Sequence, residues 1–195
     1  MGKSVLVHSC CGPCLIYPFE RLSEMGLRVT AFWYNPNIFP KNELLNRKES
    51  LLKYCSRHKI GVIAYENENR EEFYSWIFPS GHEAKTSRCK ICWDMRLRVT
   101  AKYALENKYN AFTTTLLVST YQDIDMIRKL GKKIASSYGI KFIDIDFREG
   151  FGYAHCKAEK EGLYRQRWCG CIYSFNDRFN AMVCRRSKKV DNLRL

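Results

Sequence analysis

Seven of the ten cysteines in this chain fall into three tight groups, and thiols grouped in this way bind metals. The groups are Cys10, Cys11 and Cys14; Cys89 and Cys92; and Cys169 and Cys171. One zinc ion or one cubane iron–sulfur cluster takes about four thiolates at most. Seven converging sulfurs therefore predict a cluster with a second metal ion or a redox group beside it.

A closed structural zinc site with spare thiols is the main alternative explanation of these cysteines. The spacing of Cys89 and Cys92 suits zinc and iron equally well. Cys10 and Cys11 suit structural zinc less well, because adjacent side chains point apart and address different atoms. The isolated cysteines are predicted to be packing or surface thiols: Cys55, Cys156 and Cys184.

The start of the chain argues against a disulfide framework, which is the usual state of many cysteines in a small secreted protein. The sequence opens with Met1-Gly2-Lys3-Ser4 and runs into an apolar strand, without a charged leader, a long apolar stretch and a cleavage site. We therefore expect a reducing, cytoplasmic location. The apolar runs are far shorter than the roughly 20 residues of a membrane span, so no membrane partner is expected.

The charge of the chain is strongly positive and is spread along its length. There are 33 Lys and Arg residues against 20 Asp and Glu residues, which gives a formal charge of +13. A polyanion is the natural partner of such a protein, and RNA or DNA is the leading candidate. The alternative is that the charge serves solubility alone.

The hydrophobic pattern predicts a Rossmann-like α/β fold with a parallel sheet. Continuous apolar runs, read as strands buried on both faces, alternate with amphipathic helices. The expected strands are 4–8, 28–34, 61–65, 111–117 and 141–145, and the expected helices are 12–25, 41–58, 70–77, 87–107 and 121–138. With 195 residues, the chain predicts a single domain 1–195: a core over 1–146 and a C-terminal extension over 147–195 that carries cysteines, folds back over the sheet and ends in a helix near 174–186.

The first cysteine group follows a strand directly, at the edge of the sheet where open α/β folds bind ligands. Gly12 and Pro13 then open a helix, whose positive end favours thiolates. Cys89 and Cys92 lie one helical turn apart, and Gly170 is expected to let the backbone approach a cluster closely. The first turn lacks both a dinucleotide fingerprint and a phosphate-binding glycine loop.

A series of motifs resembles the cobalamin-independent epoxyqueuosine reductases. The motifs are His8-Ser9-Cys10-Cys11-Gly12-Pro13-Cys14, Tyr34-Asn35-Pro36-Asn37-Ile38, Cys89 and Cys92, Thr113-Thr114-Thr115-Leu116-Leu117-Val118-Ser119, Tyr164-Arg165-Gln166, and Cys169-Gly170-Cys171-Ile172-Tyr173-Ser174. The resemblance implies a nucleotide alpha-hydrolase-like Rossmann fold. It also implies an enzyme that reduces epoxyqueuosine to queuosine at the wobble position of a tRNA anticodon, with a 4Fe-4S cluster beside a second metal ion.

The implied deoxygenation needs two electrons, whereas a cubane cluster normally delivers one at a time. We therefore expect the second metal to be iron, and the partner to be a one-electron donor of the ferredoxin or flavodoxin type. The seven grouped cysteines are the predicted ligands of the two metal groups. Asp146 is the predicted carboxylate ligand, with Asp123 a weaker choice, and the predicted catalytic residues are Cys10, Cys11, Asp146 and His8. A capping role for Asp146 and a core role for His8 are the alternatives.

Aromatic, amide and basic side chains near the motifs are candidates for binding the tRNA. They are Tyr34, Asn35, Tyr121, Gln122, Tyr164, Arg165 and Gln166, with Arg167 and Trp168 following directly. Rings interleaved with positive charge are suited to stacking on unpaired bases while contacting phosphate. Packing or capping is the alternative role for each.

Two other functions compete with the reductase. An iron–sulfur tRNA thiolation enzyme would share the fold, the charge and the cysteines, but it needs a pyrophosphate loop that is missing after the first strand. A zinc-stabilised nucleic-acid-binding module would have no catalysis and no colour. A closed zinc site also leaves no open coordination position for a substrate.

Overall fold

The computed structural model describes residues 2–65, 70–77 and 85–180. Its strands are β1 (Ser4–His8), β2 (Arg28–Trp33), β3 (Gly61–Ala64), β4 (Ala111–Thr114) and β5 (Lys141–Phe142). Its helices are α1 (Gly12–Glu24), α2 (Lys41–Arg57), α3 (Arg70–Ile77), α4 (Lys85–Glu106), α5 (Ile124–Tyr138) and α6 (Phe151–Lys160), with short 3-10 turns at Thr115–Val118 and Arg148–Gly150. Residues 172–180 are also helical.

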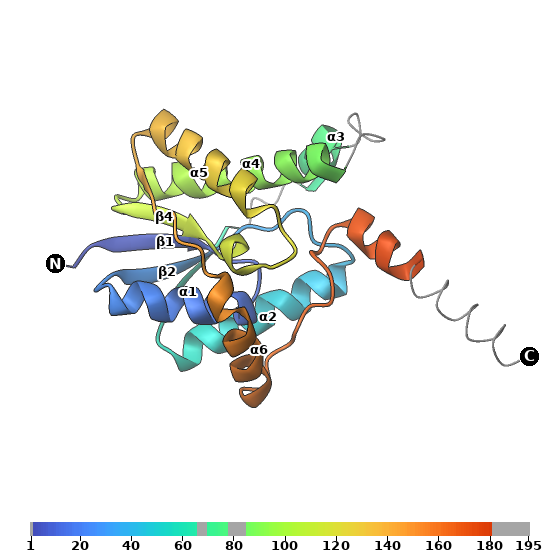
Figure 1. Cartoon of the computed structure of the whole chain (residues 1–195), viewed down its shortest axis with the longest axis horizontal. Helices are drawn as coiled ribbons and strands as arrows, with labels where there is room; N and C mark the ends of the chain where they lie inside the picture. The colour runs from blue at the N-terminus through green and yellow to red at the C-terminus, as the bar shows by residue number, and fades with distance from the viewer. Residues whose placement is uncertain (1, 66–69, 78–84, 181–195) are drawn as a thin grey trace, which may run out of the picture.

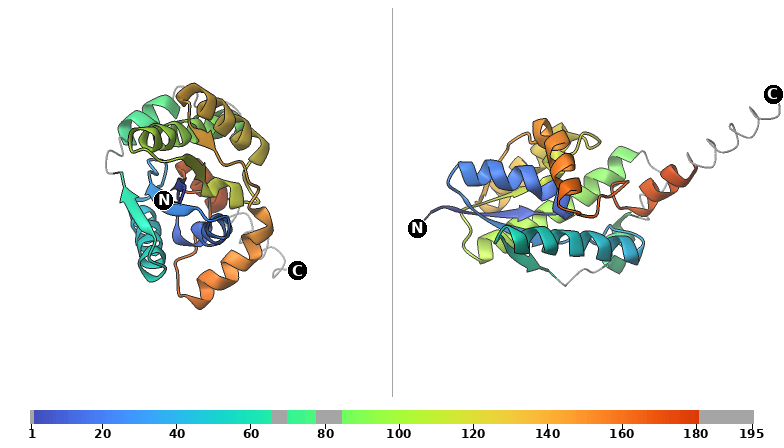
Figure 2. Two further views of the ribbon diagram at one scale, coloured as in Figure 1. Left: turned by 90° about the vertical axis from the view of Figure 1, so that its left-hand side faces the viewer. Right: turned by 90° about the horizontal axis from the view of Figure 1, so that it is seen from below.

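The strands form one parallel sheet in the order β3-β2-β1-β4-β5, between two layers of helices. Helices α1, α2 and α6 cover one face, and α4 and α5 cover the other (Figures 1 and 2). The predicted parallel α/β fold is confirmed. Since the chain reverses its direction of winding between β1 and β4, the carboxyl ends of these two strands form the crevice where such folds bind ligands.

Burial divides the sheet into a core and an edge. Strands β1 and β4 are buried along their whole length, as the apolar runs predict. The prediction was wrong for β3, whose residues are exposed or half-buried, because this strand has a neighbour on one side only. Within the described residues, no helix has the length and apolar character that a membrane span requires.

Two predicted strands end three residues early in the structure, and one helix was not predicted. The run at 111–117 leaves the sheet at Thr114, whose hydroxyl accepts a hydrogen bond from the backbone N–H of Leu116 (3.1 Å) and starts the 3-10 turn. Only Lys141 and Phe142 of the last run pair with the sheet. Helix α6 was not predicted, and the predicted end of the C-terminal helix, 181–186, lies outside the described residues.

Gly12 sets the distance between α1 and α2, the helices behind the first cysteine group. A Cβ atom at Gly12 would lie 2.5 Å from the backbone oxygen of Ser50 in α2. We expect Gly12→Ala to lower the free energy of unfolding by about 3 kcal/mol, because backbone must move to admit the methyl group. Urea denaturation checks this.

The matched control is Gly152→Ala. Gly152 lies in α6 with nothing within 4 Å of its would-be Cβ, so alanine there should leave stability unchanged or raise it by up to about 1 kcal/mol. Equal stability of the two variants would contradict the role of Gly12 as a spacer.

Candidate metal centre

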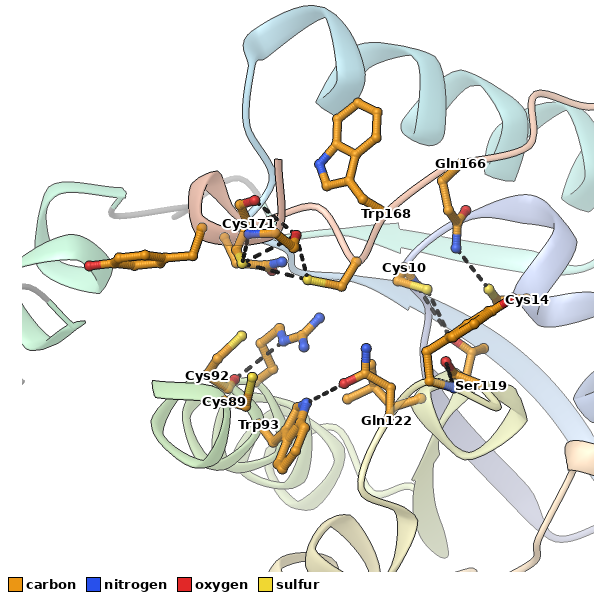
Figure 3. Close-up of a pocket in the computed structure, with 18 of the residues that line it drawn as sticks. Cys10, Cys14, Cys89, Cys92, Trp93, Ser119, Gln122, Gln166, Trp168 and Cys171 are labelled. Atoms are coloured by element: carbon orange, nitrogen blue, oxygen red, sulfur yellow. Dashed lines mark hydrogen bonds between the residues drawn. The ribbon is translucent and has the colours of Figure 1, made fainter. Parts of the chain in front are cut away.

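A cavity of about 960 Å³ lies at the crevice predicted by the sheet topology, and its walls carry thiols. Cysteines from all three sequence groups line it: Cys10, Cys14, Cys89, Cys92, Cys169 and Cys171. Figure 3 shows the cysteine pair of α4 on one side and Cys10 and Cys14 on another, with Cys171 on the loop before residues 172–180. The structure thus brings together three segments that are far apart in the sequence.

The first group is the most compact. The sulfurs of Cys10, Cys11 and Cys14 all lie within 4.8 Å of one another, and those of Cys10 and Cys11 are 3.9 Å apart. Tetrahedral Zn–S bonds of about 2.3 Å would place two ligand sulfurs about 3.8 Å apart. The donor set therefore fits a thiolate-bound metal. Cys11, which is fully buried, also caps α1, because its sulfur accepts the N–H of Cys14 at 3.4 Å.

The three thiols of this group differ in pKa. Bonds from the thiols of Cys11 and Cys14 lower the pKa of Cys10 well below its ordinary value, and Thr115 donates a further bond to the Cys10 sulfur at 3.5 Å. Burial raises the pKa of Cys11, and the bond to Cys10 raises that of Cys14. A bound cation would displace the remaining protons, because thiolates are the metal-binding form.

The third cysteine group forms a similar cluster. The sulfurs of Cys169 and Cys171 are 3.5 Å apart, and the hydrogen bond between them lowers the pKa of Cys169 to about 5. Ser174 supports both: its hydroxyl lies 2.9 Å from the Cys169 sulfur, and its backbone N–H donates to the Cys171 sulfur at 3.4 Å. These hydrogen bonds favour the thiolate form of Cys169.

A buried ion pair holds the loop that carries Cys169 and Cys171. Arg47 in α2 is fully buried, and its Nε lies 2.6 Å from Glu43 Oε1. The same guanidinium donates to the backbone oxygens of Trp168 (2.9 Å) and Cys169 (3.2 Å), and the hydroxyl of Tyr164 donates to Glu43. We call Glu43, Arg47 and Tyr164 the Arg47 network. It was missed because a Glu–Arg pair four residues apart usually indicates an exposed helix face.

Gly170 also has a packing role in the same loop, beside its predicted role of letting the backbone approach a cluster. Its φ of +113° favours glycine, and a Cβ there would lie 3.1 Å from Ile38 Cγ1 and 3.2 Å from Arg47 Nη1. The glycine is thus required by packing against α2 and the loop before it. Its backbone oxygen also accepts the N–H of Phe39 at 2.7 Å.

Helix α4 contributes two thiols and a buried cation. Burial raises the pKa of Cys92 to about 11, while nearby Arg96 opposes that rise. Arg96 is 4% exposed, lines the cavity and donates to the backbone oxygen of Cys92 at 3.3 Å. Its positive charge also helps to lower the pKa of Cys169. Trp93 ties the helix to the loop before α5 by donating to Gln122 Oε1 at 3.0 Å (Figure 3).

Three predicted catalytic residues, Cys11, His8 and Asp146, do not line the cavity. His8 is fully buried, with Nδ1 2.9 Å from the Thr114 hydroxyl and Nε2 3.1 Å from the backbone oxygen of Tyr34. Burial lowers its pKa to about 3, so the ring is neutral and has the character of a core histidine. Asp146 lies on the surface, where a hydrogen bond from Arg148 lowers its pKa. Within the described residues, the carboxylates that line the cavity are Asp123 and Asp177.

The predicted substrate-binding residues divide in the same way. Those that line the cavity are Tyr121, Gln122, Arg165 and Gln166; those that do not are Tyr34, Asn35 and Tyr164. The amide of Gln166 donates to the Cys14 sulfur at 3.2 Å, while its oxygen is buried without a hydrogen-bond partner among the described residues. Asn37, also on the cavity wall and 1% exposed, has a similarly unpartnered oxygen.

The two isolated cysteines that the structure describes, Cys55 and Cys156, do not line the cavity. Cys55 is buried in the core, and burial raises its pKa to about 12, whereas Cys156 is exposed on α6. Cys184 lies outside the described residues. The nine described cysteines are thiols and not disulfides.

Comparisons with known proteins agree with the fold and the cysteines. Among solved structures, the U34-tRNA thiolase NcsA from Methanococcus maripaludis, determined with its 4Fe-4S cluster, superposes with a TM-score of 0.55. It is 12% identical, and the alignment covers 96% of this chain and 66% of that one. At this identity the likeness concerns the fold alone, and it agrees with the parallel α/β architecture of the sheet.

Sequence relatives identify the family. The profile of Epoxyqueuosine reductase QueH matches residues 5–177. The protein of that name from Dehalococcoides mccartyi is 32% identical over 179 residues, which cover 92% of this chain and 96% of the relative. Its counterpart in Thermotoga maritima is 34% identical over 182 residues, covering 90% and 92%. These matches show that the chain belongs to the epoxyqueuosine reductase QueH family.

Proposed function

We propose that the protein reduces epoxyqueuosine to queuosine in the anticodon of tRNA, using a 4Fe-4S cluster and a neighbouring iron ion. The observation that carries the proposal is the meeting of three distant thiol groups on one cavity in a member of this family. The reaction takes up two electrons and two protons, breaks both carbon–oxygen bonds of the epoxide and yields an alkene and water. A ferredoxin or flavodoxin in the cytoplasm is the proposed electron source.

The seven grouped cysteines are the proposed ligands. When bound, such a metal pair supplies electrons one at a time and Lewis acidity toward the epoxide oxygen. Thr115 and Ser174, which contact the sulfurs of Cys10 and of the Cys169 pair, orient the thiols. Of the carboxylates, Asp123 replaces Asp146 as the proposed ligand because it lines the cavity, although its Oδ1 also caps α5 by accepting the N–H of Met126.

The remaining polar groups of the cavity bind the substrate. The unpartnered oxygens of Asn37 and Gln166 are buried, and leaving them unsatisfied costs about 1–3 kcal/mol each. N–H or O–H groups of the modified nucleoside would satisfy them. Arg165, Arg167 and Arg178 line the same cavity and are suited to contacting phosphates of the tRNA backbone.

The test is a reduction assay on protein purified without oxygen. We expect more than about four irons per chain, and the loss of one oxygen mass from the epoxyqueuosine of digested tRNA, read by mass spectrometry. A protein that contains zinc alone and leaves the nucleoside unchanged would favour the nucleic-acid-binding module. Exchange of oxygen for sulfur in the tRNA, with ATP hydrolysis, would favour a thiolation enzyme.

A further inference from the structure

Three neighbouring aromatic rings lie on the wall of the cavity and have no role in the proposed metal centre. The rings of Tyr121 and Phe151 meet edge to face with centroids 6.2 Å apart, and the ring of His155 lies 4.3 Å from that of Phe151. All three residues line the cavity. We call them the aromatic ledge, which joins the loop before α5 to helix α6.

Tyr121 is the outermost member of the ledge, with 83% of its surface exposed, and its neighbours hold it there. The hydroxyl of Ser119 accepts the backbone N–H of Tyr121 at 3.2 Å. Gln122 bonds to Trp93 (3.0 Å), and Asp123 caps α5. Because the residues on both sides of Tyr121 are anchored, its ring is presented to solvent by a fixed loop.

The ledge is continuous with the metal centre. The 3-10 turn that leads to Tyr121 begins at Thr115, whose hydroxyl contacts the Cys10 sulfur. A ligand whose reacting atom reaches the sulfurs would therefore extend outward along this segment toward Tyr121. Tyr121 lies at the rim of the cavity, whereas the reacting group of the ligand must lie deeper, at the thiols. The position of Tyr121 therefore suits a neighbouring group of the same ligand.

Charge at the ledge favours a nucleotide. Arg165 lines the cavity and pairs only at the surface, with Glu159 Oε1 at 3.0 Å. Burial, followed by the charge of Arg165, lowers the pKa of His155, so its ring is neutral at physiological pH and stacks as an aromatic group. A cavity wall that carries both an exposed ring and an arginine fits an unpaired base with its phosphate.

We propose that the aromatic ledge stacks the base of the nucleotide next to the modified one in the anticodon loop. This inference rests on the proposed tRNA substrate and adds a binding contact for its neighbouring base. Tyr121 acts as a binding residue here and takes no part in the reduction. The ledge would let the enzyme prefer an anticodon loop over a free nucleoside.

A double-mutant cycle in binding tests the proposal. The probe is a synthetic anticodon stem–loop RNA of a queuosine-type tRNA, and its dissociation constant is measured by fluorescence anisotropy with the metal-loaded protein. Tyr121→Ala should weaken binding about tenfold, and Tyr121→Phe should retain wild-type binding. With an RNA that lacks the base on one side of the wobble nucleotide, Tyr121→Ala should cause no further loss.

The matched control is Tyr153→Ala. Tyr153 is a half-exposed tyrosine on α6 that packs against Tyr17 and does not line the cavity, so its removal should leave RNA binding unchanged. The proposal is overturned if the losses of RNA binding caused by Tyr121→Ala and by base removal are additive, whichever base beside the wobble nucleotide is removed. An absence of RNA binding by the wild-type protein would overturn it as well.

The readout separates the ledge from the proposed function. Reduction of epoxyqueuosine by the wild type, without coupling at Tyr121, refutes the ledge and leaves the reductase standing. If Tyr121→Ala and base removal are coupled in RNA binding but the protein does not reduce the nucleoside, the proposed reductase function is refuted and the stacking contact stands. Equal loss of binding to tRNA and to the free nucleoside in Tyr121→Ala would place the reacting base on the ledge and contradict the proposal.

Discussion

Arg47→Met is expected to lower the free energy of unfolding by about 3–5 kcal/mol, because it leaves the buried carboxylate of Glu43 without its cation. The backbone oxygens of Trp168 and Cys169 lose their donor in the same step. The loop that carries Cys169 and Cys171 should therefore hold metal poorly. Urea denaturation gives the stability, and metal analysis of the folded protein gives the second effect.

Two further variants separate these effects. Arg98→Met breaks a pair of the same spacing, with Asp94, but at the surface, and should cost no more than about 1 kcal/mol. The double variant Glu43→Gln/Arg47→Met removes the unpaired charge and should recover stability without recovering metal content. Full metal content in this folded double variant would show that the Arg47 network does not position the loop.

Cys10→Ala is expected to lower reductase activity by about 100-fold or more, together with the metal content. Cys10 is the one member of its group whose pKa is strongly lowered, and it contacts both Cys11 and Thr115. Loss even of residues that support a metal ligand typically costs 10- to 100-fold in metal affinity or activity. Iron and sulfide analysis, combined with the tRNA assay, measures both quantities.

Cys156→Ala is the control for this variant, because it removes a lone exposed thiol on α6 and should change neither quantity. Cys10→Ala protein that keeps its metal but loses activity would assign Cys10 to substrate contact instead. Unchanged metal and activity would remove it from the centre.

The sheet and the cysteine groups could be predicted because each is encoded by local pattern. The continuous apolar runs at β1 and β4 require burial on both faces, and the structure places them at the middle of the sheet. Helix α6 was missed because small residues, Ala154 and Ala158, form its buried side, so its hydrophobic period is faint. Gly150 and Gly152 gave it the look of a loop.

The supports of the centre depend on tertiary contacts that no local pattern encodes. Arg47 and Arg96 are buried, although arginine in a helix is usually exposed. Asp146 lies four residues beyond β5 and not directly at its end, and Arg148, two residues further on, pairs with it at the surface. The positions of residues near the strand ends were therefore sufficient to predict the crevice. They were not sufficient to predict which side chains line it.

The three walls of the cavity are synthesised at very different times. Cys10 leaves the ribosome 159 residues before Cys169, and Cys171 follows two residues later. Strand β1 must also wait for β4 before both of its edges are paired. A nascent chain thus carries open thiols that no wall yet encloses. The cavity is therefore enclosed only after Cys171 has been synthesised, and a chain that stops short of Cys169 would lack one of its walls.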